Sequence, residues 1–386
     1  MHRRTNARDP RLGTSGPAIL LSSPRVLVVA KIGTSSLTDD SGLIDDAMVA
    51  KVAREAAVLR DDGHRVVLVT SGAIAAGLSP LGLARPTDLP TLQAVAAVGQ
   101  HRLMRTWDEH LCSHGLVSGQ VLLAPYDFVE RAQYLHARQT LTRLLDLGVV
   151  PIVNENDAVA DDEIRYGDND NLAALVAHLV YADLLVLLTD TAGLLTADPR
   201  LDAAATLIEE IVQVDTALEA LAGGAGSVRG SGGMASKLAA AKIAAWSGVR
   251  SVIAAAARPD VLLDAVAGAP GVGTVVLPRG RRLPARKLWI AFALGSSGTV
   301  VVDDGARRAL TERAVSLLPA GVLGVKGGFA AGAAVELADQ AGRIFAKGLV
   351  RHSAATIDAL AGRRTPDLPA DLPHEVIHRD DLVMLP

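Results

Sequence analysis

Short apolar runs alternate with helix-length amphipathic segments from residue 25 to about residue 277, and this alternation constrains the fold more than any other feature. The apolar runs lie at 26–30, 66–69, 117–123, 149–153, 184–188 and 251–255. The amphipathic segments between them include 45–62, 93–114, 131–147 and 235–247. Because strands that alternate with helices form βαβ units, we predict an α/β, three-layer sandwich around a mostly parallel open sheet.

The pattern changes near residue 278. The basic segment 278–284, PRGRRLP, is bounded by prolines, which is typical of a linker. Short strand-like runs follow at 288–291, 299–302, 333–337 and 343–347, with turn residues between them. We therefore predict a first domain at 24–277, a linker at 278–284 and a small, mainly β domain at 285–386, a size typical of one domain.

Composition narrows the class of protein. The net charge of −4 provides no global positive field that would attract nucleic acid or an anionic membrane. Cys112 is the only cysteine, which excludes an internal disulfide and a cysteine-rich zinc site and fits a reducing, cytoplasmic location. No apolar run approaches the length of a transmembrane helix. Residues 1–23, with four arginines among Pro, Ser and Gly, are predicted to be a disordered extension, with a nucleic-acid-binding tail as the alternative.

The most polar segment follows the apolar run at 149–153. Asn154-Glu155-Asn156-Asp157 ends that run, and Gly167-Asp168-Asn169-Asp170-Asn171 precedes a helical pattern of leucines and valines. Ligands of open α/β sheets bind beyond the carboxyl ends of the strands. We therefore expect a site here for a small polar ligand that carries an amine or a metal. Asp168 and Asp170 could alternatively cap the helix, position Mg²⁺ or hold lysine side chains.

Two further polar turns follow the first two predicted strands, at 26–30 and 66–69. Gly33 and the hydroxyl residues after Lys31 leave backbone N–H groups open, which suits phosphate oxygens; an ordinary turn is the alternative. Ser71 follows the second strand, but no G-x-S-x-G elbow surrounds it. Ser71 is therefore interpreted as a ligand hydrogen-bonding residue or a helix N-cap rather than a nucleophile.

Two more segments complete the predicted edge of the sheet. The Gly/Ser-rich segment 223–237 matches neither the Walker A nor the dinucleotide fingerprint, although such a loop before a helix offers backbone donors to phosphate. Lys237 lies one turn into that helix, where it could bridge nucleotide and acceptor. A flexible surface loop is the alternative. Thr189-Asp190 ends the fifth strand, a position that favours ligand contact over a plain βα turn.

These motifs resemble those of the amino acid kinase family, and within it of the glutamate 5-kinases that carry a C-terminal PUA domain. The resemblance runs from about Val26 to the C-terminus. The matching blocks are VVAKIGTSSLT, VTSGAIAAG, AAVGQHRL, PIVNENDAVA, YGDNDNLAALVA, LLTDTAGLLTADPR, GSGGMASKLAAA, RKLWI, SLLPAGV and EVIHRDDLV. The pairing of NENDAV with GDNDN is specific to this branch; aspartokinases and acetylglutamate kinases share the fold but not the pair.

The resemblance implies the amino acid kinase fold and ATP-dependent phosphorylation of the side-chain carboxylate of L-glutamate to L-glutamyl 5-phosphate, the first step of proline synthesis. It implies Mg²⁺ that is held mainly through the ATP phosphates and not by direct protein ligation. It also implies inhibition by proline, at a loop that matches Glu163-Ile164-Arg165, and a homo-oligomer, either a dimer or a tetramer.

The resemblance also implies roles for individual residues. Lys31 and Lys237 would stabilise charge on the transferring phosphoryl group, and Asp170 would hold the two lysines in register. The glutamate-binding residues would be Ser71, Asn154, Asp157, Asp168 and Asn169. The ATP-binding residues would be Gly33, Thr34, Thr189, Asp190, Ser231, Gly232, Gly233, Met234, Ala235, Ser236 and Lys237. The family often has Thr in place of Ser231 and Ser236, but either hydroxyl can donate and accept a hydrogen bond.

Two other functions stay open from the sequence. One is an amino acid kinase with a different carboxylate acceptor. The other is RNA binding or regulation through the PUA domain, since PUA domains elsewhere bind RNA. RNA recognition favours basic grooves and exposed aromatic planes, whereas this domain is not strongly basic and has few aromatic residues. The linker arginines Arg279, Arg281 and Arg282 form the best candidate RNA-binding patch. We expect the domain to be structural or regulatory and not to bind RNA.

Overall fold

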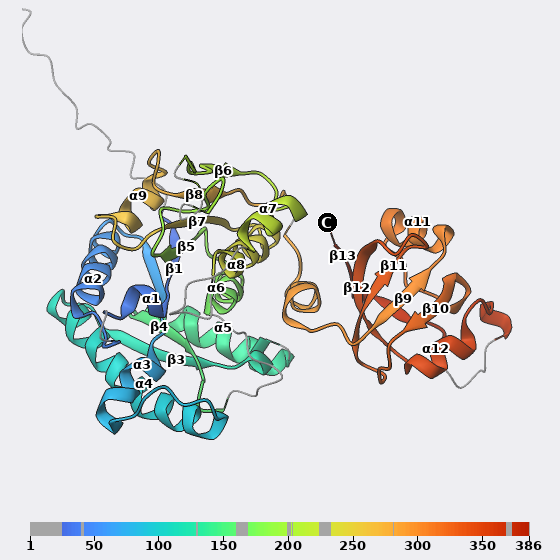
Figure 1. Cartoon of the computed structure of the whole chain (residues 1–386), viewed down its shortest axis with the longest axis horizontal. Coiled ribbons are helices and arrows are strands. Elements are labelled where there is room, and N and C mark those ends of the chain that lie inside the picture. The colour runs from blue at the N-terminus through green and yellow to red at the C-terminus, as the bar shows by residue number, and fades with distance from the viewer. Residues whose placement is uncertain are drawn as a thin grey trace, which may run out of the picture.

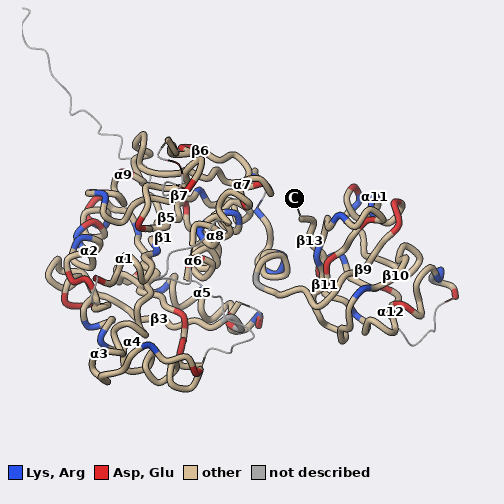
Figure 2. The backbone as a smooth tube through the Cα atoms, viewed as in Figure 1, with Lys and Arg blue, Asp and Glu red and all other residues tan. Residues whose placement is uncertain are grey.

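Two β-sheets, each with its own helices, make up the molecule (Figure 1). The computed structural model describes residues 25–39, 42–128, 130–159, 169–198, 202, 204–223, 233–280, 282–367 and 373–385. The predicted N-terminal extension lies outside these residues. Acidic and basic residues are distributed over both parts of the molecule (Figure 2). No helix within the described ranges is both long and apolar enough to cross a membrane.

Eight strands of the described chain form the larger sheet, in the order β3-β4-β2-β1-β5-β7-β8-β6. Their bounds are β1 (Leu27–Ile32), β2 (Arg65–Val69), β3 (Ser118–Leu123), β4 (Val150–Glu155), β5 (Leu184–Thr189), β6 (Glu210–Ile211), β7 (Arg250–Ala255) and β8 (Thr274–Val276). Neighbouring strands run parallel except β7 and β8, which are antiparallel. The predicted mostly parallel sheet is therefore confirmed, and each predicted apolar run of this region is a strand.

Helices cover both faces of this sheet, and the alternation of side chains along β1 shows the two faces directly. Val28 and Ala30 pack into the core under α2, α4 and α9, whereas Leu27 and Val29 pack into the core under α5, α6 and α8. The predicted three-layer sandwich is confirmed. The helices of this part are α1 (Thr34–Leu37), α2 (Asp46–Asp61), α3 (Ala73–Leu81), α4 (Leu89–Ser113), α5 (Arg131–Asp146), α6 (Asn169–Leu179), α7 (Thr216–Ala222), α8 (Met234–Trp246) and α9 (Val261–Ala267), with the 3-10 turn η1 (Pro125–Phe128).

Two glycines let α3 and α4 cross in close contact. A Cβ on Gly99 would lie 1.7 Å from the carbonyl oxygen of Ala73, and a Cβ on Gly77 would lie 2.0 Å from that of Val95. Real side chains do not approach backbone so closely, so this crossing requires glycine at both positions. It sets the N-terminus of α3, and with it the Ser71-Gly72 turn, against α4.

The smaller sheet contains five strands of the described chain in the order β10-β9-β11-β12-β13. They are β9 (Thr299–Val302), β10 (Val322–Lys326), β11 (Ala334–Ala338), β12 (Ile344–Val350) and β13 (Ile377–Met384). Around them lie α11 (Asp304–Arg313), η3 (Pro319–Gly321), α12 (Ala354–Leu360) and η4 (Thr365–Asp367). The predicted strands at 299–302, 333–337 and 343–347 are confirmed, and the mainly β character of this part with them.

The predicted strand at 288–291 is wrong, because this segment is helical. Helix α10 (Ala285–Leu288) continues into the π-helical segment η2 (Trp289–Ala293). A short apolar run cannot be assigned to strand or helix by its pattern alone. Here the helical form buries Leu288 and Ile290 in a cluster with Trp246 of α8 and Val383 of β13. The segment therefore packs between α8 and β13.

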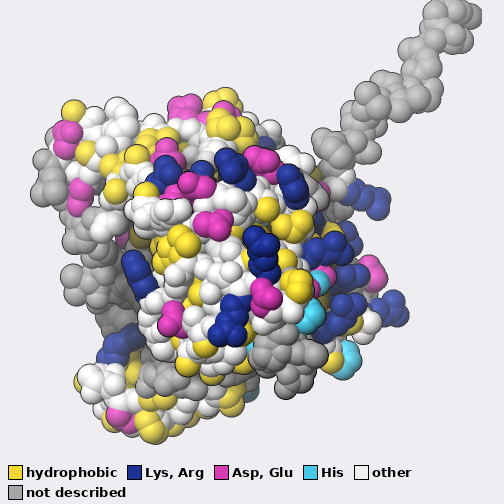
Figure 3. Space-filling view, turned by 90° about the vertical axis from the view of Figure 1, so that its right-hand side faces the viewer, with side chains coloured by type: hydrophobic (Ala, Val, Ile, Leu, Met, Phe, Trp, Pro, Cys, Tyr) yellow, Lys and Arg dark blue, Asp and Glu magenta, His cyan; other side chains and the backbone are white. Residues whose placement is uncertain are grey.

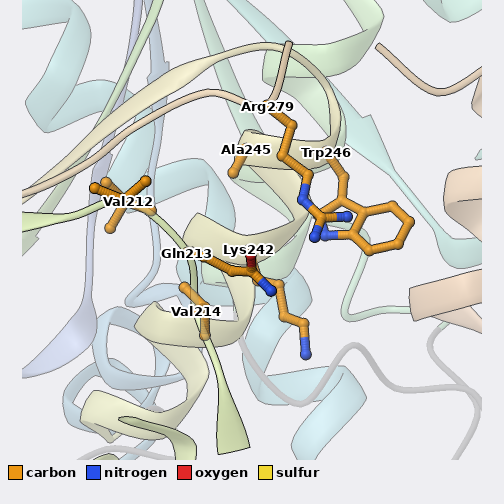
Figure 4. Close-up of a pocket in the computed structure, with 8 residues that line it drawn as sticks. Val212, Gln213, Val214, Lys242, Ala245, Trp246 and Arg279 are labelled. Carbon is orange, nitrogen blue, oxygen red and sulfur yellow. The ribbon is translucent and has the colours of Figure 1, made fainter. Parts of the chain in front are cut away.

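The basic segment 278–284 lies against the end of α8. Arg279 N–H donates to the carbonyl of Ala245 (2.9 Å), and Leu283 N–H donates to that of Trp246 (3.0 Å). The Arg279 guanidinium lies 4.2 Å from the centroid of the Trp246 ring (Figure 4). The cavity beside this contact has a volume of about 10 Å³, room for about one water, so it is a packing gap and not a ligand pocket.

Candidate active site

Four neighbouring strands of the large sheet bring their carboxyl ends to one edge. Lys31 of β1 is level with Val69 of β2, which is level with Val153 of β4. On the other side of β1, Ile32 is level with Leu188 of β5. The residues just beyond these positions, among them Gly33, Thr70, Asn154 and Thr189, therefore lie side by side. The predicted convergence of the strand-end motifs is seen in the structure.

A buried cluster of two lysines and one aspartate lies at this edge. Lys31 Nζ is 2.6 Å from Asp170 Oδ1, and Lys237 Nζ is 3.2 Å from Asp170 Oδ2. The three residues are 2%, 5% and 0% exposed. Ser236 Oγ also donates to Asp170 Oδ2 (2.9 Å). Two ammonium groups thus lie together at the edge of the sheet, where they can donate hydrogen bonds to the oxygens of an anionic ligand.

The fold explains why these three side chains meet. Lys31 is near the end of the central strand β1, Asp170 is in the first turn of α6, and Lys237 is in the first turn of α8. A carboxylate is stabilised at a helix N-terminus, whereas an ammonium group is not. The pairing of Lys237 with Asp170 offsets this unfavourable position, since α6 and α8 pack against each other. The structure thus brings together the three residues that the resemblance implies as catalytic.

Three helices at this edge begin at glycines. Gly33, Gly72 and Gly233 are the N-caps of α1, α3 and α8, and no described side chain caps these helices. By contrast, Asp45 and Asp88 cap α2 and α4 elsewhere. Among the described residues, the first amides of α1, α3 and α8 thus have no side-chain partner, an arrangement that suits phosphate.

Five of the predicted ATP-binding residues follow these glycines. A Cβ on Gly33 would lie 3.1 Å from Lys31 Nζ, so glycine keeps clear space around the ammonium group. Thr34 is the first residue of α1, and Met234, Ala235, Ser236 and Lys237 form the first turn of α8. Ser231, Gly232, Asp168 and the predicted proline loop at Glu163, Ile164 and Arg165 lie outside the described residues.

An amide network joins three of the predicted glutamate-binding residues. The Asn169 Nδ2 group lies within hydrogen-bond distance of the Thr70 carbonyl (2.7 Å), Ser71 Oγ (2.9 Å) and Asn154 Oδ1 (2.8 Å). Asn154 is 1% and Asn169 is 9% exposed. Residues from β4, from the turn after β2 and from α6 are thus held together by buried hydrogen bonds, next to the lysine cluster because Asn169 precedes Asp170.

Asp157 lies on a cavity of about 320 Å³ beside this network. Residues of α3, α4, β3, the end of β4 and the turn after it line the cavity: Ala73, Ala96, Ala97, Gln100, His101, Gln120, Leu122, Glu155, Asn156, Asp157 and Ala158. This volume is at the lower end of the range for small-molecule sites, which suits a ligand of the size of an amino acid.

Thr189 and Asp190 end β5 on the other side of β1. Thr189 is buried, and its Oγ1 donates to Asp190 Oδ1 (3.0 Å). Asp190 is exposed. Because Leu188 is level with Ile32, Thr189 lies beside Gly33, the first glycine of the predicted phosphate site.

Two residues of α4 support the site but are not among the predicted site residues. Gln100 Oε1 accepts a hydrogen bond from Asn154 Nδ2 (2.7 Å). Trp107, which is fully buried, donates from Nε1 to Thr70 Oγ1 (3.1 Å). The sequence signal for Gln100 is its place beside Gly99 in the block AAVGQHRL, where a polar residue borders the buried face of a helix.

Comparison with known proteins agrees with both parts of the fold. Residues 26–255 match the model of the amino acid kinase family, and residues 298–370 match that of the PUA domain. The chain is 45% identical over 363 residues to the glutamate 5-kinase of Pelobacter propionicus, covering 93% of this chain and 97% of that protein. It is 46% identical over 371 residues to the glutamate 5-kinase of Paraburkholderia phymatum, covering 95% and 99%. Among solved structures, a carbamate kinase from Giardia lamblia is 18% identical with a TM-score of 0.49, covering 66% of this chain and 99% of that one.

Proposed function

This chain belongs to the amino acid kinase family, and we propose that it phosphorylates the side-chain carboxylate of L-glutamate with ATP to give L-glutamyl 5-phosphate and ADP. The observation that carries this proposal is the buried Lys31–Asp170–Lys237 cluster, which holds two ammonium groups at the carboxyl edge of the sheet. The names of the relatives that match nearly the whole chain support glutamate as the acceptor.

The reaction requires no covalent catalysis by the protein. The glutamate side chain is already ionised at pH 7, so no general base is needed. One oxygen of its carboxylate forms a bond to the γ-phosphorus of ATP as the bond from that phosphorus to the bridging oxygen breaks. ADP leaves with the electron pair, and no proton is transferred. Alignment of the two substrates and neutralisation of the phosphoryl oxygens are therefore the main catalytic requirements.

The lysine cluster can meet the second requirement. The ammonium groups of Lys31 and Lys237 are proposed to bind oxygens of the transferring group, where charge is redistributed in the transition state. Asp170 keeps both ammonium groups in position through its two carboxylate oxygens. Because the groups are already ordered and buried, they need not reorganise when the reaction occurs.

The residues around the cluster are suited to a nucleoside triphosphate. Ser36 Oγ is buried and has no hydrogen-bond partner among the described residues, and the uncapped amides after Gly33 and Gly233 are further donors. We assign ATP to these groups, together with Thr34, the first turn of α8, Thr189, Asp190, and Ser231 and Gly232 beyond the described residues. Mg²⁺ would be held mainly through the phosphates, whose charge it would partly neutralise.

Glutamate is assigned to the amide network and the neighbouring cavity. Ser71, Asn154 and Asn169 provide hydrogen-bonding groups, and Asp157 and Asp168 are proposed to face the amine of the substrate. The lines of support are the contacts of Asn169 and the place of Asp157 on the cavity.

The biological setting is proposed from the relatives and the sequence resemblance. L-Glutamyl 5-phosphate would feed proline synthesis in the cytoplasm, and proline would inhibit the enzyme. The chain would assemble into dimers or tetramers. The first domain at 24–277 would carry the kinase activity, and the domain at 285–386 would have a structural or regulatory role.

Trapping of the acyl phosphate tests the proposed reaction. The purified protein is incubated with ATP, Mg²⁺, hydroxylamine and one candidate acid in each tube, and the hydroxamate formed is measured. We expect hydroxamate with L-glutamate alone, and less of it when proline is added. A product with aspartate or acetylglutamate instead would overturn the acceptor. No product with any acid, from folded protein that still binds ATP, would overturn the kinase proposal.

A further inference from the structure

Three side-chain amides form a chain of hydrogen bonds at the candidate site. Asn169 Nδ2 donates to Asn154 Oδ1 (2.8 Å), and Asn154 Nδ2 donates to Gln100 Oε1 (2.7 Å). The chain thus runs from the N-terminus of α6, across the end of β4, to the middle of α4. Gln100 is its last member and has no role in the function proposed above.

Backbone groups fix the orientation of every amide in this chain. The Thr70 carbonyl can only accept, so the Asn169 atom 2.7 Å from it is the nitrogen. The Glu155 N–H can only donate, so the Asn154 atom 2.9 Å from it is the oxygen. The nitrogen of Asn154 consequently faces Gln100, whose oxygen must accept. If the oxygen and nitrogen of one of these amides were exchanged, an assignment that is usually open, these hydrogen bonds could not form.

Two atoms of the chain remain without a partner. Within the described part of the protein, Asn169 Oδ1 and Gln100 Nε2 are buried and make no hydrogen bond. A buried polar group without a partner destabilises a protein, so such a pair of atoms points to a ligand. One atom is an acceptor and the other is a donor. A free amino acid carries the complementary groups, an ammonium donor and a carboxylate acceptor, on a single carbon.

The cavity beside the chain is suited to this ligand. Gln100 and Asp157 both line the cavity of about 320 Å³. The Asp157 carboxylate complements an ammonium group, whereas the amide nitrogen of Gln100 complements a carboxylate. Asn169 is adjacent in sequence to Asp170, which binds the two lysines. A ligand bound by the amides can therefore present a second carboxylate to the lysine cluster.

We propose that Gln100 determines specificity for an α-amino acid by donating a hydrogen bond from Nε2 to the α-carboxylate of the substrate. Asn169 Oδ1 then accepts from its ammonium group. This inference rests on the proposed function, because it identifies which end of L-glutamate lies at α4. Gln100 acts on binding and not on phosphoryl transfer, so its removal weakens the affinity for glutamate and leaves the affinity for ATP unchanged.

Two variants of the full-length protein test this role. Gln100→Ala removes the donor. Gln100→Glu retains an oxygen that accepts from Asn154 but places a negative charge where the donor was. Gln139→Ala, an exposed glutamine on α5, is the matched control. For each protein, KM and kcat are measured with L-glutamate by hydroxamate formation. The rise in unfolding temperature on adding L-glutamate, and separately ATP, is measured as well, because it reports binding without turnover.

We expect Gln100→Ala to raise the glutamate KM about 10- to 100-fold, the loss typical of a hydrogen bond to a charged group, with kcat nearly unchanged. The glutamate concentration needed for thermal stabilisation rises by the same factor, and stabilisation by ATP matches that of the control. Gln100→Glu weakens glutamate binding at least as much, because two carboxylates then repel each other.

Three results would overturn the inference. Tighter glutamate binding by Gln100→Glu would place the substrate ammonium group, not its carboxylate, at this position. An unchanged KM in Gln100→Ala would remove Gln100 from the site. A parallel loss of glutamate and ATP stabilisation would make its role structural. Absence of hydroxamate from the unmodified protein is a different outcome, since it would contradict the proposed reaction itself.

Discussion

At the scale of single residues, the position of the two lysines around Asp170 is the feature on which the proposed chemistry depends. One buried carboxylate contacts two buried ammonium groups and holds both at the edge of the sheet. Removing one lysine would remove one of the two positive charges proposed to bind the transferring group. Its effect should therefore appear in the step in which charge moves between the phosphoryl oxygens, and much less in the binding of a substrate elsewhere on the network.

Lys237→Ala is expected to reduce kcat about 10²- to 10³-fold, the loss typical of removing one transition-state donor, with a small change in the glutamate KM. Steady-state hydroxamate formation measures both constants. Lys242→Ala is the matched control, because Lys242 lies on the same helix and pairs with Glu219 at the surface (2.6 Å). A large rise in KM at unchanged kcat would contradict the assigned role of Lys237.

His178, at the other end of α6 from Asp170, makes the stability of the protein depend on pH. Its ring is buried beside the Arg282 guanidinium, with 3.3 Å between Nδ1 and Nη2. Burial, and secondarily the charge of Arg282, lowers the pKa of His178 to about 3. The group is therefore neutral in the folded protein, whereas in the unfolded chain it gains a proton below about pH 6.5. Its contribution to stability is complete above that pH and is lost as the pH falls towards 3.

His178→Gln should reduce the acid sensitivity of folding. Each pH unit below about 6.5 lowers the free energy of unfolding of the unmodified protein by up to about 1.4 kcal/mol through this group. The glutamine variant lacks this loss. Denaturant unfolding at pH 7, 5 and 4 measures the free energy of unfolding of both proteins. As the pH falls, this free energy should decrease less in the variant than in the unmodified protein. Parallel curves would mean that His178 does not remain neutral in the folded state.

At the scale of elements, the crossing of α3 and α4 connects packing to the site. Helix α3 follows the Ser71-Gly72 turn directly, and Gly72 adopts a positive φ of 100° that favours glycine. Helix α4 carries Gln100 next to Gly99, the closest point of the crossing. A change in the separation of these helices would therefore move both Ser71 and Gln100 relative to Asn154.

Gly99→Ala is expected to destabilise the protein by about 1–3 kcal/mol, as over-packing does, and to raise the glutamate KM. The added Cβ would lie 1.7 Å from the Ala73 carbonyl oxygen and 2.5 Å from the Gly77 nitrogen, so α3 must move. Denaturant unfolding and steady-state kinetics measure the two effects. Gly324→Ala on β10, where nothing lies within 4 Å of the new atom, should have little effect on either. A fully stable Gly99→Ala with normal KM would show that the crossing does not position the site.

The elements also show what the sequence can and cannot predict. The apolar runs predict the strands of the large sheet, because a buried parallel strand is apolar on both faces. Since parallel strands end at one edge, the motifs with Lys31 and Asn154 can be placed together before the structure is known. The position of Gln100 depends on the α3–α4 crossing, which no local pattern specifies. The helical form of 288–291 likewise depends on burial against Trp246, a contact between segments far apart in sequence.

At the scale of the whole molecule, the segment from 278 to 293 connects the two sheets and contacts both α8 and β13. Arg279 lies over Trp246 of α8, whereas Arg286 pairs with Asp381 of β13 (2.6 Å). Trp246 and Phe292 meet edge to face with 5.6 Å between their ring centroids. On the face shown in Figure 3, basic side chains are interspersed with acidic and apolar ones. The smaller domain is therefore packed against the end of α8, whose first turn carries Lys237.

A chain that ends at residue 284 should retain kinase activity but unfold at a lower temperature than the full chain. The catalytic groups assigned above all precede residue 284. Trp246, only 6% exposed in the full chain, would lose the side chains of Leu288, Ile290 and Phe292 that cover it. Thermal unfolding and hydroxamate formation measure the two properties, with full-length Phe292→Ala as a milder comparison. A truncated protein that folds but has no activity would make the smaller domain part of the catalytic unit.

The central claim is that the side-chain carboxylate of glutamate attacks the γ-phosphorus, and labelled oxygen tests it most directly. L-Glutamate with ¹⁸O in both side-chain carboxylate oxygens is incubated with the protein, ATP, Mg²⁺ and hydroxylamine, and the released phosphate is observed by ³¹P NMR. Hydroxylamine attacks the acyl carbon, so the oxygen that joined carbon to phosphorus stays with phosphate. The account predicts phosphate that carries one ¹⁸O atom per molecule. Unlabelled phosphate, released at the same rate with or without glutamate, would contradict it.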